Sequence, residues 1–176
     1  FNKNLFKKKL IKKMKSMEEW KKIQSLMYGE LMHQAEINRG FSNFVLLCNL
    51  KKYQIFIISH KTKFAHYDKN KIDLRKKSLL WMKKNKFFNK NYLNLQIENV
   101  YFEDSLVKKI KRIKEINCDY FIDDLEKVFD HKSFPNNTKK ILYNKTSHSN
   151  KYNYVSDSWD QVIEIFNNSS NLAYAQ

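Results

Sequence analysis

The fold of this chain is decided by the stretch Asn117-Cys118-Asp119-Tyr120-Phe121-Ile122-Asp123-Asp124-Leu125. Its apolar centre, 120–122, has the length and the two-sided apolar character of a strand buried on both faces of a sheet. Asp123 and Asp124 follow at the carboxyl end of that strand, where open α/β sheets bind their ligands. Two adjacent carboxylates repel unless a cation lies between them, so the pair is a candidate site for a hard divalent ion such as Mg²⁺. Asp is also a common N-cap residue, and the alternative is that Asp124 caps a helix beginning at Leu125.

Helical and strand-like patterns alternate over most of the chain. Short apolar runs predict further strands at 53–59, 100–102, 140–143 and 152–155. Apolar residues spaced by three and four predict helices at 4–32 (with a break at Gly29), 41–50, 74–84, from 105 onward, 125–129 and 159–166, followed by a frayed polar tail. Strands that alternate with helices indicate βαβ units, so we expect an α/β fold with a mainly parallel sheet and helices on both faces. The all-helical pattern ends near residue 38, which divides the chain into segments 1–37 and 38–176.

The composition is strongly basic. Among 176 residues there are 34 Lys and Arg against 18 Asp and Glu, a formal net charge of +16 that would attract nucleic acid or an anionic surface at low salt. Nearly all the excess is Lys spread along the chain beside many Asn, with only 2 Gly and 1 Pro, which also fits a genome biased toward AT-rich codons. We weight that bias above a dedicated nucleic-acid surface. Either way, the positive field favours small molecules that carry phosphate.

Targeting and membrane signals are missing from the sequence pattern. No apolar run approaches the roughly 20 residues that a membrane-spanning helix needs, so no membrane association is expected. Residues 1–15 lack the continuous apolar centre and the small-residue cleavage site of a signal peptide. Cys48 and Cys118 have no metal-ligand spacing and lie in apolar contexts, which favours buried free thiols in a reducing, cytoplasmic location.

A hydroxyl, lysines and the acidic pair are expected to meet at one edge of the sheet. Ser59 ends the strand predicted at 53–59, and lysines occupy the helix that precedes the acidic strand. A hydroxyl can donate to one phosphoryl oxygen, an ammonium group can neutralise charge, and a carboxylate-bound metal can bridge another oxygen. The set therefore favours the binding of a phosphoryl group.

Two motifs together resemble those of the haloacid dehalogenase (HAD) superfamily of phosphohydrolases. They are Ile57-Ile58-Ser59-His60-Lys61-Thr62 and the acidic stretch 118–125, and they look most like an uncharacterised group of HAD-like hydrolases. Phe134-Pro135 and Lys140-Ile141-Leu142 are also similar, so the resemblance covers roughly residues 36–166. It implies a Rossmann-like core over 38–176, a helical cap segment over 1–37, and a Mg²⁺-dependent phosphatase acting on a small phosphorylated molecule.

The resemblance also assigns roles to individual residues. Ser59 would orient the phosphoryl group, while Asp123 and Asp124 would hold Mg²⁺ directly or through water. His60, Lys61 and Thr62 lie just past the hydroxyl, where they would contact substrate, although a surface role for His60 is equally compatible.

The catalytic lysine of the family has three candidates in this sequence: Lys108, Lys109 and Lys111. Lys109 is favoured because it precedes the apolar residues Ile110 and Ile113 in the manner of the family's lysine. Val107, Ile110 and Ile113 are expected to face inward on this helix, with lysines outward.

The chain departs from the family at its first motif, a strand that ends in Asp-x-Asp and supplies the nucleophile and the general acid/base. No Asp occurs before Asp68. We therefore expect a HAD-like core without its first strand, inactive as it stands. Two alternatives remain: a phosphate- or metal-binding pseudoenzyme, and a basic nucleic-acid-binding domain.

Overall fold

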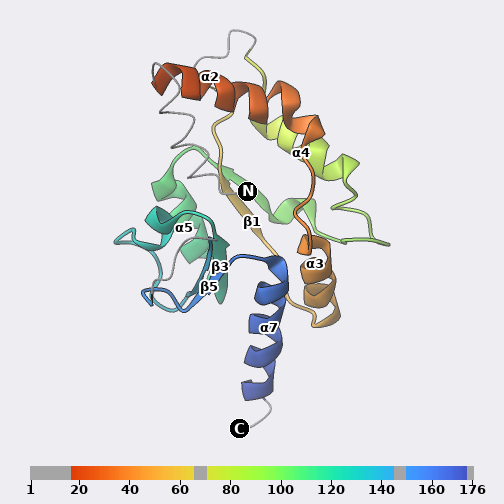
Figure 1. The fold of residues 1–176 in the computed structure, drawn as a ribbon, viewed down its shortest axis with the longest axis vertical. Coiled ribbons are helices and arrows are strands. Elements are labelled where there is room, and N and C mark those ends of the chain that lie inside the picture. The colour runs from red at the N-terminus through yellow and green to blue at the C-terminus, as the bar shows by residue number, and fades with distance from the viewer. Residues whose placement is uncertain (1–16, 66–70, 145–149, 174–176) are drawn as a thin grey trace.

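A computed structural model describes residues 17–65, 71–144 and 150–173 of the chain. These residues form a mixed α/β structure with short parallel strands (Figure 1). The helices are α2 (Met17–Tyr28), α3 (Phe41–Leu50), α4 (Leu74–Lys84), α5 (Leu106–Ile116), α6 (Glu126–Phe129) and α7 (Trp159–Ala173), with short 3-10 helices η1 (Glu30–Gln34) and η2 (Ile97–Asn99). The predicted α/β class is therefore confirmed.

The strands are parallel, as expected, but they form two small sheets. In the first sheet, β1 (Ile57–His60) pairs with β2 (Val100–Glu103), and Ser59 lies opposite Phe102. In the second sheet, β4 (Lys139–Tyr143) lies between β3 (Tyr120–Asp123) and β5 (Tyr154–Ser156).

Several element boundaries differ from the sequence predictions. Helices α3 and α4 have the predicted bounds, and Gly29 separates α2 from η1 as expected, whereas 4–16 of the first predicted helix lies outside the described residues. Strand β1 covers Ile57–His60 instead of the predicted 53–59. The Tyr53 amide donates to Cys48 O at the end of α3, and the Ile55 carbonyl accepts from the Asn99 side chain at 3.3 Å, so neither group pairs with a strand. The prediction of a frayed tail from residue 167 is wrong for 167–173, which continue α7.

Two hydrophobic clusters pack against the strands. The first cluster joins α3, α7 and the segment 85–95, through residues that include Val45, Leu93 and Val162. The second joins α5 to the segment 125–134, through residues that include Ile110, Ile113 and Phe129. Each cluster contains side chains from both sheets, and successive residues of a strand alternate between the clusters: Ile57 and Ile122 belong to the first, Ile58 and Phe121 to the second. Both sheets therefore lie between the same two clusters.

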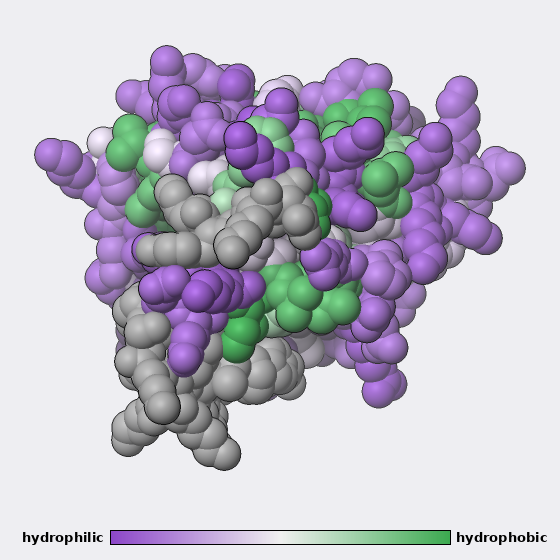
Figure 2. Space-filling view, turned by 90° about the horizontal axis from the view of Figure 1, so that it is seen from above, coloured by the Kyte–Doolittle hydropathy of each residue, from purple (hydrophilic) through white to green (hydrophobic). Residues whose placement is uncertain are grey.

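Helices α2, η1 and α4 pack together at the end of the molecule drawn uppermost in Figure 1. The Trp81 indole in α4 donates to Ala35 O at 2.7 Å, which fastens α4 to the end of η1. Seen from this side, the surface is mostly hydrophilic, with hydrophobic side chains in small groups (Figure 2). None of the described helices is long and apolar enough to cross a membrane.

Candidate functional site at the carboxyl ends of the strands

Helix α5 positions the lysines of the candidate site. Ser105 caps its first turn by accepting a hydrogen bond from Lys108 N at 3.2 Å. Ile110 and Ile113 are fully buried in the second cluster, and Lys109 lies on the same face of the helix. The expectation that Val107 points inward is wrong, since the residue as a whole is 63% exposed. The expectation that the lysines point outward fails for Lys109, of which only 7% of the whole residue is exposed.

Lys109 forms a buried ion pair with Asp123. Its Nζ contacts Asp123 Oδ2 at the carboxyl end of β3 and lies 5.3 Å from the centre of the Phe121 ring. The other carboxylate oxygen, Oδ1, accepts a hydrogen bond from Leu125 N at 2.9 Å. Both charged groups are thus removed from water but partnered, which is the condition under which buried charges are tolerated.

Burial dominates the electrostatics of Asp123. Desolvation raises the pKa of its carboxyl above the ordinary value, and the neighbouring Lys109 charge and hydrogen bonds oppose that rise without cancelling it. The negative charge of Asp124 adds a smaller upward contribution to the Asp123 pKa. The buried pair therefore carries a desolvation cost that an ion pair on the surface does not.

Asp124 has a different environment from its neighbour, because its side chain is exposed. The alternative that Asp124 caps the following helix is wrong: α6 begins at Glu126, Leu125 is its N-cap residue, and no side chain caps it. It is the Asp123 carboxylate that accepts a hydrogen bond from the Leu125 backbone amide. Asp124 is thus left facing solvent at the carboxyl end of β3.

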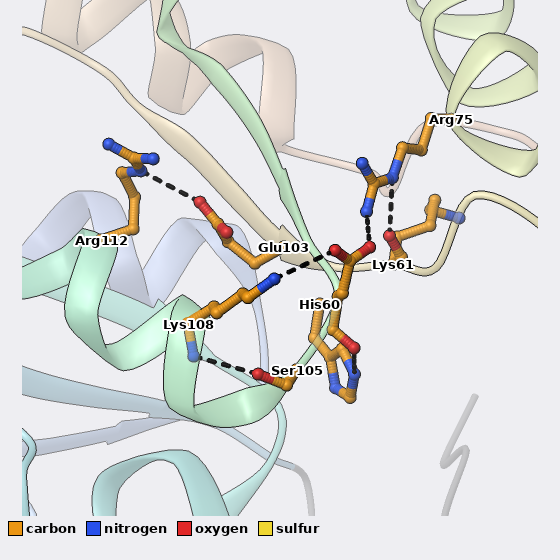
Figure 3. A network of polar contacts seen from close by, with 8 residues as sticks. His60, Lys61, Arg75, Glu103, Ser105, Lys108 and Arg112 are labelled. Carbon is orange, nitrogen blue, oxygen red and sulfur yellow. Dashed lines mark hydrogen bonds and ion pairs between the residues drawn. The ribbon is translucent and has the colours of Figure 1, made fainter.

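A second polar cluster lies past the ends of β1 and β2 (Figure 3). Asp104 follows β2 directly, and its carboxylate contacts the Arg75 guanidinium from α4 and Lys108 Nζ from α5, the latter at 3.3 Å. Arg75 Nε also donates to Lys61 O at 3.0 Å, in the loop that follows β1. Asp104 therefore joins α4, α5 and the ends of both strands of the first sheet.

The residues predicted around Ser59 are spread along β1 and its following loop. Ser59 is half-buried inside β1, one residue before the strand ends at the exposed His60. The His60 ring Nε2 lies 3.1 Å from Asp104 O. Lys61 Nζ lies over the ring of Tyr28 in α2, 4.6 Å from its centre, and the Thr62 hydroxyl donates to Phe64 O at 2.9 Å.

The first turn of α5 connects the two ends of the candidate site. Lys108 contacts Asp104 after β2, while the adjacent Lys109 contacts Asp123 at the end of β3. The carboxyl ends of β2 and β3, one from each sheet, are therefore both joined to the first turn of α5. Ser59, by contrast, makes no hydrogen bond to Lys109, Asp123 or Asp124 within the part of the chain that the structure describes.

The donor chemistry of the acidic pair fits Mg²⁺ only with water as the main ligand. Asp123 already accepts from Lys109 and Leu125 N, and Asp124 offers an exposed carboxylate. Over residues 17–65, 71–144 and 150–173, no group of three or more His, Cys, Asp or Glu side chains could share an ion. Mg²⁺ commonly binds through one or two carboxylates and keeps several waters, so Asp124, supported by Asp123, would be its protein ligand.

Three residues that sequence reasoning did not select contribute to this region: Tyr28, Arg75 and Asp104. The position of Asp104 could have been predicted from the sequence, because an Asp just after a parallel strand lies at the same edge of the sheet as Ser59. Tyr28 and Arg75 reach the edge from distant helices, and no local pattern marks them.

Comparisons of the chain with protein-family models, with curated proteins and with solved structures find no match.

Proposed function

We propose that this chain forms a HAD-like phosphohydrolase core, in which the carboxyl ends of the strands bind the phosphoryl group of a small molecule. The observation that carries the proposal is the buried contact between Lys109 and Asp123, beside an exposed Asp124. A cation buried against a carboxylate at the end of a parallel strand is costly for stability, and such groups concentrate at functional sites.

In this proposal Lys109 fixes Asp123 and adds positive charge at the edge of the sheet. Ser59 donates a hydrogen bond to a phosphoryl oxygen, and Lys61 supplies a further cation on the cap side. Mg²⁺, when bound through Asp124 beside Asp123, would neutralise phosphoryl charge as a Lewis acid. The two sheets would belong to one Rossmann-like arrangement, with α3 and α7 on one face and α5 and α6 on the other, and α2 and η1 would belong to the cap.

Residues 1–176 alone are expected to bind phosphate without turning a substrate over, because the proposed mechanism also needs the Asp-x-Asp motif that the sequence lacks. A natural pseudoenzyme would bind phosphate in the same way. The two are separated by activity of a longer form of the protein that includes such a motif: a hydrolase then gains Mg²⁺-dependent phosphatase activity, and a pseudoenzyme does not.

The site itself is tested by calorimetric titration of the chain with inorganic phosphate, with and without Mg²⁺. We expect Mg²⁺ to strengthen phosphate binding, and Asp124→Asn to abolish that enhancement. Asp157→Asn is the matched control, because Asp157 is an exposed carboxylate just after β5 and its loss removes the same charge. Ser59→Ala should weaken phosphate binding under both conditions. Equal effects of the two Asp substitutions, or unchanged binding in Ser59→Ala, would contradict the proposed site.

A further inference from the structure

The charged residues of the described part of the chain are unevenly distributed. Residues 74–97, which include α4 and the segment that follows it, contain seven Lys and Arg and no Asp or Glu. Residues 152–173, which include β5 and α7, contain three Asp and Glu and no Lys or Arg. Helix α4 lies toward the end drawn uppermost in Figure 1, and α7 extends toward the opposite end. The fold therefore separates a basic region from an acidic one, which a uniform bias toward Lys codons would not produce.

Helix α4 presents its lysines on one face. Its buried side chains are Leu74, Ser78 and Met82, so the positions between them face solvent. The exposed residues of this face and of the segment after it are, in order, Lys76, Lys77, Leu80, Lys83, Lys84, Lys86 and Lys90. The basic face defined by these residues is thus interrupted by one leucine.

The lysines of the basic face lack acidic partners. In α5, by contrast, Lys108 and Lys109 each contact a carboxylate. Within the described part of the chain, the ion pair formed by α4 is that of Arg75 with Asp104, and no carboxylate contacts a lysine of the basic face. Like charges spaced by three and four residues on a helix repel each other, so an anionic partner would stabilise this surface.

The composition of the basic face argues against a membrane as that partner. A helix that lies in a membrane interface buries a wide apolar face among the lipids. Helix α4 instead buries its apolar face within the protein, and its exposed face offers the lipids Leu80 alone among apolar side chains.

The spacing of the lysines suits the backbone of nucleic acid. Lys76 and Lys83 are seven positions apart in α4, which corresponds to about 10 Å along the helix axis, and each nucleic-acid strand carries a charge about every 3.4 Å of its axis. The two lysines can therefore reach different phosphates. An ammonium group is a point charge without the planar fork that reads base edges, and Arg75 is already engaged by Asp104.

We propose that the basic face of α4 binds the phosphate backbone of nucleic acid without preference for base sequence. The residues of the phosphoryl site are not among its lysines, so this binding does not depend on the function proposed above. Charge complementarity would hold the two surfaces together, and the affinity would fall steeply with salt.

Lys86 offers a variant that removes one charge and suits the backbone. Its φ is 59°, in the left-handed region, and it follows the end of α4, where glycine is the favoured residue. Lys86→Gly should therefore preserve the fold while it removes one contact to phosphate.

Fluorescence anisotropy of short labelled DNA duplexes, one of A·T pairs and one of G·C pairs, tests the proposal at increasing NaCl in EDTA. The main variant combines Lys76→Gln, Lys77→Gln and Lys83→Gln, because Gln keeps a helix propensity close to that of Lys. We expect it to weaken the binding of both duplexes about tenfold or more, and to reduce the slope of log K against log NaCl by about three, one for each phosphate contact. Lys86→Gly should reduce the slope by about one.

The matched control combines Lys114→Gln, Lys127→Gln and Lys132→Gln, which removes the same charge from exposed lysines outside the basic face. The affinity and the slope should change little in this variant. Equal weakening by the two triple variants would overturn the proposal, because binding would then follow net charge alone.

Three further results would overturn it: unchanged binding in the α4 triple variant, a strong preference for one duplex, or binding to phosphatidylserine vesicles without binding to DNA. Circular dichroism checks that the triple variant is folded, and if it is not, an unchanged slope in Lys86→Gly overturns the proposal by itself. The measurement needs neither Mg²⁺ nor inorganic phosphate, so its failure is distinct from failure of the phosphoryl site.

Discussion

Lys108 and Lys109 are neighbours in the first turn of α5, and each contacts a carboxylate at the end of a strand. The Lys108 side chain is 61% exposed and pairs with the exposed Asp104, whereas the Lys109 side chain is 9% exposed and pairs with the buried Asp123. The same two residue types thus form a surface network at the end of β2 and a buried pair at the end of β3.

The difference between these regions is one of solvation. Exposed ion pairs are weakened by water and salt, so they contribute little to stability, and their partners can be exchanged at low cost. A buried pair depends on both partners, because removal of one leaves an isolated charge in an apolar environment. The end of β3 should therefore respond strongly to single substitutions, and the end of β2 weakly.

The largest expected effect is that of Lys109→Met. The substitution leaves the Asp123 carboxylate buried without its cation, and we expect the free energy of unfolding at neutral pH to fall by about 3–5 kcal/mol. Denaturant unfolding followed by circular dichroism measures it. Lys108→Met is the matched control and should cost less than about 1 kcal/mol. The double substitution Lys109→Met with Asp123→Leu should recover much of the lost stability. Equal losses for Lys109→Met and Lys108→Met would contradict the difference expected between the buried and the exposed ion pair.

An intermediate effect is expected from pH. The pKa of Asp123 is raised in the folded state, so the folded protein binds the proton more tightly than the unfolded chain does. The contribution of Asp123 to stability should therefore be greatest below its ordinary pKa and should fall as the pH rises through the raised folded value.

The measurement is the stability of the wild type minus that of Asp123→Asn across this range. The difference should decrease as the pH rises and then level off above the folded pKa of Asp123. An increase with pH would mean that the attraction of Lys109 outweighs the desolvation of the carboxylate.

The smallest effect is expected at the end of β2. Arg75→Met removes the contact between α4 and Asp104, but Asp104 is exposed and keeps Lys108 as a partner. The loss of stability should be below about 1 kcal/mol and should shrink further in high salt, as measured by unfolding in low and high NaCl. If the loss were independent of salt and as large as that of Lys109→Met, the contacts of Asp104 would stabilise the fold as much as the buried pair of Lys109 and Asp123 does.

The elements that could be predicted from sequence are those that local spacing determines. The bounds of α3 and α4 follow directly from apolar periodicity, and the strand before Asp123 follows from its apolar run. The later start of β1 could not be foreseen, since Tyr53 N bonds to Cys48 O at the end of α3 and Ile55 O accepts from the distant Asn99 side chain.

Part of the candidate site was also within reach of the sequence. Lys109 was selected among three lysines because of its place beside Ile110, and the structure shows it to be the one that contacts Asp123. Val107 was placed inward because it is apolar and lies three residues before Ile110, but Lys109, four residues before Ile113, is the residue that is buried. The roles proposed for Ser59, Asp124 and Mg²⁺ depend on groups beyond local spacing and stay predictions.

The registers of the two sheets also bear on the order in which the molecule assembles. Strands β3 and β4 are joined by a short connection that contains α6, whereas β1 and β2 close a long segment that contains all of α4. Closing a longer loop costs more chain entropy, and pairing of sequence-distant strands slows folding. The second sheet should therefore form early and serve as the surface on which β1 and β2 later dock, with α5 as the link between the two stages.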